Sequence, residues 1–195
     1  MADPDKPTAG MLKITIEHTP SPSDPDGADE FYTALGILIV AWGRLEGHFV
    51  VCLLMLLNLP GGKEFGEQLP MQFDRRATIW RKAFETMPVL QAFRDLALDL
   101  LAEIKDVASD RNTVVHALWE PFAPNEPPSI DIVTIKHKNK TKDGLDVHRH
   151  TVTTAMLKEI GEKANRLNLT LTPLSQFLTR YRSSQNPPPS DIRKI

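Results

Sequence analysis

Cysteine is almost absent from this 195-residue sequence, which contains only Cys52. A lone thiol forms no internal disulfide, so nothing indicates a secreted, oxidising setting. The chain does not open on a basic segment followed by an apolar one. We therefore expect no signal peptide and a cytoplasmic protein.

Common catalytic signatures are missing as well. The sequence has no glycine-rich phosphate loop, no Gly-x-Ser-x-Gly motif and no Cys/His pairing typical of nucleophilic catalysis. His148 and His150 are two residues apart and so lie on the same face of the expected strand. No cysteine or acidic residue at suitable spacing completes a set of metal ligands with them. We therefore expect neither a bound metal nor another cofactor.

A strong excess of charge of one sign is also lacking, because the formal net charge is −2. Residues 1–30 hold seven acidic residues and two lysines, which leaves 18 acidic and 21 basic residues for 31–195. The larger part is therefore mildly basic. That balance permits contact with RNA without by itself indicating it.

The longest apolar stretch covers residues 31–59 and holds Arg44, Glu46 and His48 near its centre. A membrane span needs roughly 20 mainly apolar residues, and three ionisable groups at mid-depth would be costly. We therefore interpret the stretch as a long helix buried in protein, and we expect no membrane partner.

The hydrophobic pattern predicts a mainly α-helical fold, because apolar residues recur at helical spacing in several stretches. Asp29 can cap the first helix, and Pro60-Gly61-Gly62 ends it. Thr172 and Pro173 suit the cap and the first position of the last helix. The expected helices cover residues 29–59, 71–87 and 88–108, a stretch around 157–167, and one from 172 to about 181.

Ser109 and Asp110 are good cap residues, so a new helix could start there, hold Leu118 and end before Pro121. One helix that continues through both positions is the alternative, and the sequence leaves the choice open.

Alternation of apolar and polar residues predicts a strand over Met11–His18, and two more strand-like segments are Ile130–Ile135 and Leu145–Val152. The polar segment between the last two ends in Asp143-Gly144, a turn signal, so we expect a β-hairpin over about 130–151. The expected organisation is a tail with a short strand and a Pro-rich linker over 1–28, a helical domain over 29–182, and a flexible tail over 183–195.

One segment carries chemistry: Arg111-Asn112-Thr113-Val114-Val115-His116. Histidine is well suited to move a proton near neutral pH, and arginine offers a permanently charged, planar fork that matches phosphate oxygens. Together they could cleave RNA without a metal. His116 would take the proton of the ribose 2′-hydroxyl, or return one to the leaving oxygen, while Arg111 holds the phosphate.

The spacing within this segment raises a difficulty. Five residues on an ideal helix correspond to a rotation of about 140°, so Arg111 and His116 do not share a face if both are helical. A long arginine near a helix start eases the mismatch. A symmetric dimer would ease it further, because both pairs could then meet in one cleft.

The segment resembles the R-x(4–6)-H signature of the HEPN superfamily, the higher eukaryote and prokaryote nucleotide-binding domains. The long first helix and the helical pair before the motif are similar too, so the resemblance covers about residues 30–119 and the closing helices. It implies a HEPN-like antiparallel helical bundle, here with a β-hairpin addition, that forms a homodimer with a composite ribonuclease cleft. It also implies that Arg111 and His116 are catalytic, that Asn112 supports them, and that the protein acts in toxin–antitoxin or phage-defence systems, with a protein antitoxin as a partner.

Other interpretations of the motif remain open. Many HEPN members have lost catalysis, so the alternative function is a non-catalytic module that binds RNA, a nucleotide or a protein. Arg111 and His116 could also be structural, with the arginine paired to an acid and the histidine packed beside Trp119. Asn112 could be a cap residue. Some HEPN toxins carry a tyrosine where this chain has Leu118, so we expect no regulation through that position.

Two further sets of polar residues are candidates. Glu46 could orient Arg111, although it could equally face solvent or pair with Arg44. Three lysines of the expected hairpin turn could contact RNA phosphates, although a solvated turn explains them as well: Lys136, Lys138 and Lys140.

Overall fold

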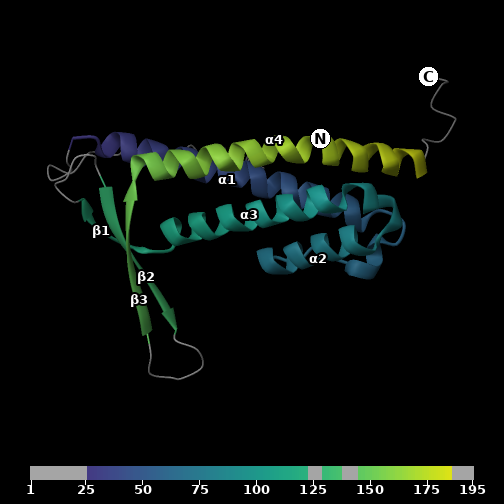
Figure 1. The fold of residues 1–195 in the computed structure, drawn as a ribbon, viewed down its shortest axis with the longest axis horizontal. Helices are drawn as coiled ribbons and strands as arrows, with labels where there is room; N and C mark the ends of the chain where they lie inside the picture. Colours follow the sequence, from purple (N-terminus) through teal and green to yellow (C-terminus); the bar gives the residue numbers. More distant parts are fainter. Residues whose placement is uncertain (1–25, 123–128, 138–144, 186–195) are drawn as a thin grey trace, which may run out of the picture.

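The computed structural model describes residues 26–122, 129–137 and 145–185. This part of the chain is mainly helical, as expected, with a three-stranded antiparallel sheet at one end (Figure 1). The helices are α1 (Ala28–Leu57), α2 (Phe73–Thr86), α3 (Arg94–Val115) and α4 (Thr154–Gln185); the strands are β1 (Leu118–Phe122), β2 (Ser129–His137) and β3 (Leu145–Thr153); short 3-10 helices cover Gly62–Phe65 and Pro88–Phe93. The predicted strand over Met11–His18 lies outside the described residues.

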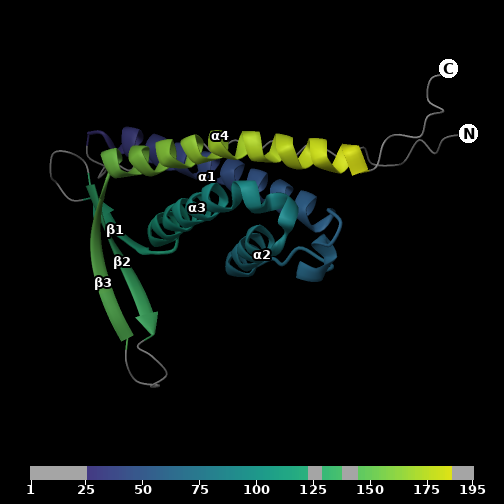
Figure 2. The same cartoon turned by 45° about the vertical axis from the view of Figure 1, so that its right-hand side comes forward.

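α1 and α4 lie side by side and run in the same direction (Figure 1, Figure 2). Near their starts Lys158 donates a hydrogen bond to Glu30 at 2.6 Å, and further along both helices His48 contacts Asn168 at 3.0 Å. This pair differs from the antiparallel arrangement expected for the bundle. The reason is that α3 carries the chain back along the bundle, and the sheet then joins the end of α3 to the start of α4.

The closing part of the domain is one helix, α4, with Pro173 inside it. A proline in a helix interior removes a backbone hydrogen bond and costs about 3 kcal/mol. Four leucines on both sides of this proline are nevertheless buried in the core: Leu167, Leu171, Leu174 and Leu178. Burial of that continuous stripe offsets the loss, so the predicted break at Thr172 is wrong.

Ser109 and Asp110 lie inside α3 and start no new helix. The continuous helix, one of the two alternatives, is therefore confirmed. Its buried face runs on past both residues, from Val107 to Val114, and this burial outweighs their preference for a cap position. The Arg111–His116 segment consequently lies at the end of a helix and not at its start.

The predicted β-hairpin is confirmed, with β2 and β3 paired antiparallel from Ser129 opposite Thr153 to His137 opposite Leu145. β1 is the third strand and pairs with β2. The prediction that a helix holds Leu118 is wrong, because α3 ends at Val115 and β1 begins at Leu118.

The core of the described part consists of two apolar clusters. The larger one lies along the helices and includes the fully buried Trp80. The smaller one joins the start of α1 to the sheet and includes Phe31 and Ile132. α3 contributes to both, through Val107 to the larger cluster and through Val114 to the smaller.

Within the described residues, α1 is the one helix long and apolar enough, by length and composition, to cross a membrane. In the structure 39% of its most apolar 18-residue window is buried, and the core helix of a soluble protein passes the same test. α1 therefore has one face in the core and one face outside it.

Burial raises the pKa of the Cys52 thiol on α1 to about 12. The thiolate is the reactive form of cysteine, so the folded protein presents a neutral, shielded thiol at mildly alkaline pH. We expect iodoacetamide to leave Cys52 unmodified in the native protein and to alkylate it in urea, as measured by intact-protein mass spectrometry. Labelling at the same rate in both conditions would contradict this burial.

Candidate functional site

Arg111 lies on the buried face of α3. It follows Val107 by four residues, which places both on the same side of the helix. Val107 belongs to the larger apolar cluster and Val114 to the smaller one, so Arg111 lies between the two clusters along α3. The side chain is half-buried, and its Nε is buried with no hydrogen-bond partner among the described residues. Arg76, which has an acidic partner, also has a buried Nε without a hydrogen-bond partner in the described part, so this atom alone does not set Arg111 apart.

His116 and Arg111 meet within one chain. His116 is the C-cap residue of α3, and its side chain is exposed. The long Arg111 side chain bridges the angular gap between the two positions, so that its Nη1 lies 3.3 Å from His116 Nε2. The contact therefore needs no second copy of the chain.

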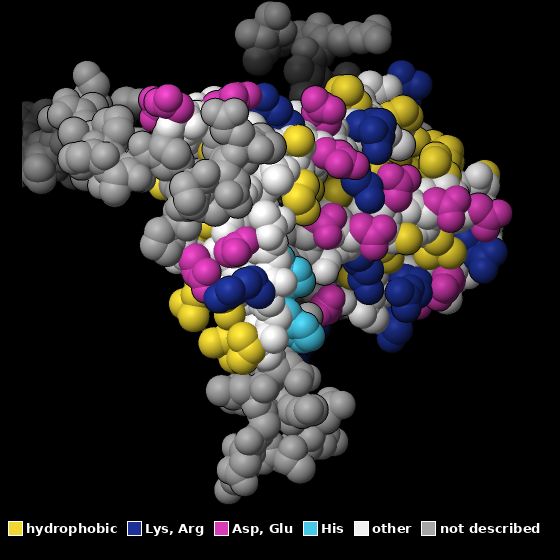
Figure 3. All heavy atoms as spheres, turned by 60° about the vertical axis from the view of Figure 1, so that its left-hand side comes forward, with side chains coloured by type: hydrophobic (Ala, Val, Ile, Leu, Met, Phe, Trp, Pro, Cys, Tyr) yellow, Lys and Arg dark blue, Asp and Glu magenta, His cyan; other side chains and the backbone are white. Residues whose placement is uncertain are grey.

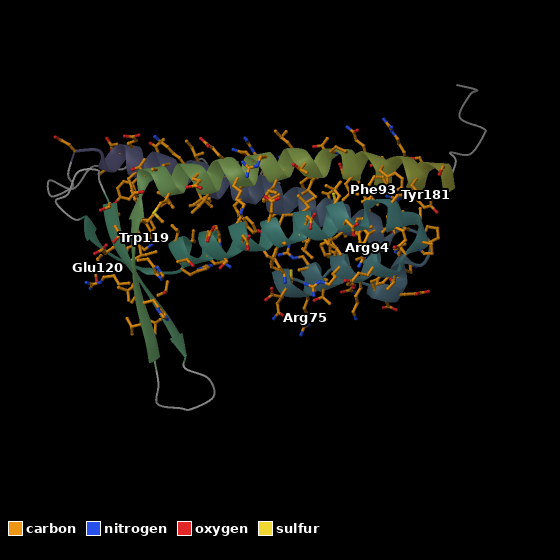
Figure 4. The ribbon with its side chains drawn as sticks, viewed as in Figure 1. Arg75, Phe93, Arg94, Trp119, Glu120 and Tyr181 are labelled. Carbon is orange, nitrogen blue, oxygen red and sulfur yellow. The ribbon has the colours of Figure 1, made fainter. Side chains whose placement is uncertain are left out.

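Trp119 holds the turn that follows α3. Its indole N–H donates to the Val114 carbonyl oxygen at 2.9 Å, which pairs one of the carbonyls that a helix end leaves without a partner. The ring also packs edge-on against Phe31 of α1, with centroids 5.9 Å apart. Figure 4 shows Trp119 at the junction of the sheet with the helices. These contacts determine where the chain leaves α3 and hence where His116 stands.

Asn112 completes a polar group that we call the Arg–Asn–His trio: Arg111, Asn112 and His116. The Asn112 side-chain oxygen accepts a hydrogen bond from Arg111 Nη1 at 2.9 Å, and its backbone oxygen accepts one from the His116 N–H at 3.1 Å. Asn112 lies near the end of α3, so it is not a cap at a helix start. It orients the guanidinium toward the imidazole.

If Arg111 and His116 were purely structural, we would expect the arginine to pair with an acid and the histidine to pack beside Trp119. The environment of the trio differs from this expectation. In the part of the chain that the structure describes, Arg111 has no acidic partner. His116 is exposed, whereas a structural histidine would pack against Trp119. The positive charge of Arg111 is therefore available to an anion.

The direction of the hydrogen bond between Arg111 and His116 follows from the chemistry of the guanidinium. A guanidinium only donates, so His116 Nε2 is the acceptor in this contact. A phosphate would bind the guanidinium more strongly than the imidazole does. Phosphate binding would then free Nε2 to accept a proton.

Two hollows flank the last turns of α3. One, of about 420 Å³, lies between α3, the sheet and α4, and its polar lining includes Asp110, His150 and Glu159. The other, of about 650 Å³, lies between α3 and the start of α2, where Lys105 and Asn112 line it. Through Asn112 the second hollow adjoins the trio, and Asp74 lines it together with Lys105.

Glu46 does not pair with Arg111. Its carboxylate accepts hydrogen bonds from Arg76 Nη2 at 2.6 Å and from the Trp42 indole at 3.1 Å. This corrects the hypothesis that Glu46 orients Arg111, and Arg44 is not its partner either. The reason is that α2 packs on α1 at this level and brings an arginine to Glu46.

Arg76 is the buried charged residue that sequence reasoning missed. It is 9% exposed, and its guanidinium lies 5.9 Å from the centre of the Phe73 ring. Its spacing carried a signal, since Arg76 follows Phe73 by three residues and precedes Trp80 by four, on the apolar face of α2. A charge on a buried face requires a partner, and Glu46 supplies it.

The structure does not test the three candidate lysines. Lys136 belongs to β2, whereas Lys138 and Lys140 lie outside the described residues. Acidic and basic side chains are interspersed on the face seen in Figure 3 and form no single basic track there. Within the described ranges, no group of three or more His, Cys, Asp or Glu side chains could hold a metal ion.

Comparisons with family models, curated proteins and solved structures found no match for this chain. The resemblance to the HEPN superfamily therefore stays a prediction, and the geometry of the trio is the basis for a function.

We expect Glu46→Gln to lower the free energy of unfolding by about 1–3 kcal/mol, because the buried Arg76 guanidinium loses its charged partner. Urea denaturation measures this change. Glu46 does not touch the trio, so any activity that depends on the trio should be the same in the folded variant and the wild type. Glu64→Gln, at an exposed position, is the matched control for stability. Loss of such an activity at unchanged stability would show that Glu46 acts on the trio after all.

Proposed function

We propose that the protein is a metal-independent endoribonuclease of HEPN type in which one chain supplies both reacting side chains. The distance of 3.3 Å between Arg111 Nη1 and His116 Nε2 is the observation that supports this most directly. It places a proton acceptor next to a phosphate-binding fork. The absence of an acidic partner for Arg111 among the described residues supports it further.

The proposed reaction uses the 2′-hydroxyl of RNA. A phosphate of the RNA binds Arg111 and draws the guanidinium away from His116. Nε2 then takes the 2′-hydroxyl proton while the 2′-oxygen attacks phosphorus and the bond from phosphorus to the 5′-oxygen breaks. Arg111 stabilises the charge that builds up on the phosphate oxygens. The departing 5′-oxygen takes a proton from solvent, so the products are a 2′,3′-cyclic phosphate and a 5′-hydroxyl.

The surroundings of the trio give RNA a direction of approach. The hollow beside Asn112 also contains Lys105, whose ammonium group can contact a neighbouring phosphate. A ribonuclease of this kind suits a toxin or a defence component. A protein antitoxin is the partner that a toxin role would require.

His116→Ala should lower the rate of RNA cleavage about 10²-fold or more, because the general base is lost. Arg111→Lys should also lower the rate, because an ammonium group lacks the planar fork that holds two phosphate oxygens. Initial rates on a defined RNA measure both effects. His148→Ala removes another exposed histidine, outside the trio, and should keep the wild-type rate. Equal rates for the wild type and His116→Ala would rule out the proposed mechanism.

The same assay separates this mechanism from a metal-dependent one. Cleavage should persist in excess chelator and stop when the 2′-hydroxyl at the cleaved nucleotide is methylated. Mass spectrometry of the products should show cyclic phosphate ends. Cleavage of DNA, or activity that disappears with chelator, would contradict the proposal.

A non-catalytic module that binds RNA, a nucleotide or a protein is the second candidate function. Its support is that, in the part of the chain that the structure describes, Arg111 and His116 line neither of the two hollows beside α3, and the His116 side chain is exposed to water. Such a module would bind RNA without cutting it. Fluorescence anisotropy would then show weaker binding for Arg111→Ala and unchanged binding for His116→Ala.

A further inference from the structure

The hollow between α3, α4 and the sheet has an apolar floor. Its volume of about 420 Å³ falls in the range of roughly 300–1,000 Å³ that small-molecule sites occupy. Val114 of α3, Ile132 of β2 and Val152 of β3 are buried in it, and Ile160 of α4 is half-buried beside them. The floor is therefore built by elements that meet where both helices reach the sheet (Figure 1).

Two acidic side chains at the rim of this hollow have no counter-ion. Asp110 of α3 and Glu159 of α4 both line the hollow, and both are exposed. Within the described ranges, neither carboxylate takes part in an ion pair. We call Asp110 and Glu159 the rim carboxylates.

A lysine also lines the hollow, but its charge is directed away from the rim carboxylates. Lys163 Nζ lies 3.9 Å from Asp106 Oδ2. Asp106 precedes Asp110 by four residues on α3, and Lys163 follows Glu159 by four residues on α4. The ion pair therefore lies about one turn farther from the sheet than the rim carboxylates do.

The basic residues next to the rim carboxylates in the sequence are also engaged elsewhere. Arg111 directs its guanidinium to Asn112 and His116. Lys158 donates a hydrogen bond to Glu30 at 2.6 Å. The sheet side of the rim consequently keeps a negative charge that these cations do not neutralise.

We propose that the hollow binds an organic cation, namely an amine with an apolar body. The body would cover the floor, and the ammonium group would face Asp110 and Glu159. An ammonium group has three donors and no acceptor, so one group can serve two carboxylates. Exposed ion pairs contribute little energy, so burial of the body would supply most of the affinity. The rim carboxylates would then select a cation over a neutral or anionic ligand of the same shape.

This ligand site does not rest on the proposed ribonuclease function. Neither Arg111 nor His116, nor Asn112 between them, lines this hollow. Amine binding is measured without RNA, and RNA cleavage is measured without an amine. A failure of one proposal therefore leaves the other standing.

Three compounds with one indole body and different charges test the proposal: tryptamine, tryptophol and indole-3-propionate. They carry an ammonium group, a hydroxyl group and a carboxylate, respectively. Each is titrated at pH 7 into the full ¹⁵N-labelled chain, and the amide shifts give both the dissociation constant and the place of binding. Tryptamine should bind about fivefold more tightly than tryptophol, and indole-3-propionate should bind most weakly. The amides of Val114 and Val152 should be among those that shift.

Asp110→Asn and Glu159→Gln should each raise the dissociation constant of tryptamine about threefold, because each removes one exposed ion pair. Neither should change the binding of tryptophol. Glu103→Gln on α3 and Glu162→Gln on α4 are the matched controls, since both are exposed carboxylates that do not line the hollow. Both controls should bind tryptamine as the wild type does. All four positions are exposed, so the melting temperatures should stay at the wild-type value.

The other results of these titrations contradict the proposal. Equal dissociation constants for tryptamine and tryptophol would show that the rim carboxylates select nothing. Tightest binding of indole-3-propionate would make Lys163 the group that recognises the ligand. If neither tryptamine nor the smaller phenethylamine shifts the amides of the hollow at millimolar concentration, the hollow is not a site for amines.

Discussion

The hydrogen bond from the Trp119 indole to the Val114 carbonyl oxygen is the contact on which the candidate site depends. The last carbonyl groups of a helix lack partners within the helix, and this indole supplies one where α3 ends. The same ring packs on Phe31, which ties the end of α3 to the start of α1. The chain then enters β1, and the sheet carries it to α4. The place of His116 next to Arg111 is a consequence of that ending.

Two arginines on buried helix faces illustrate how the surroundings decide the role of a charge. Arg76 is buried, and Glu46 neutralises it, so this pair joins α2 to α1. Arg111 is half-buried, and in the described part its guanidinium contacts the Asn112 amide and the His116 ring but no acidic group. Its apolar stem can pack with the core while its charged end stays accessible. Among the described residues, an acidic partner is what distinguishes the Arg76 site from the Arg111 site.

Sequence patterns predicted the helices and strands in which the local preference of the residues agrees with their burial in the folded chain. The apolar spacing of α2, the long run of α1 and the turn signal of the β2–β3 hairpin all matched the structure. The predictions failed where a local preference opposed tertiary burial. Pro173 sits inside α4 because the leucines around it are buried, and Ser109 and Asp110 lie inside α3 because its buried face continues.

The sequence by itself determined the helical class and the hairpin, and it singled out Arg111, Asn112 and His116 as candidate site residues. These are local properties, since periodicity and side-chain chemistry can be read within a few turns of chain. Only the tertiary structure decided that Glu46 pairs with Arg76, that α1 and α4 run in the same direction, and that Ile37, Val40, Val51 and Leu54 of α1 are exposed. Each of these three features depends on which helix faces pack together in the folded chain. The residues involved are far apart in the sequence, so no local pattern indicates that they will be in contact.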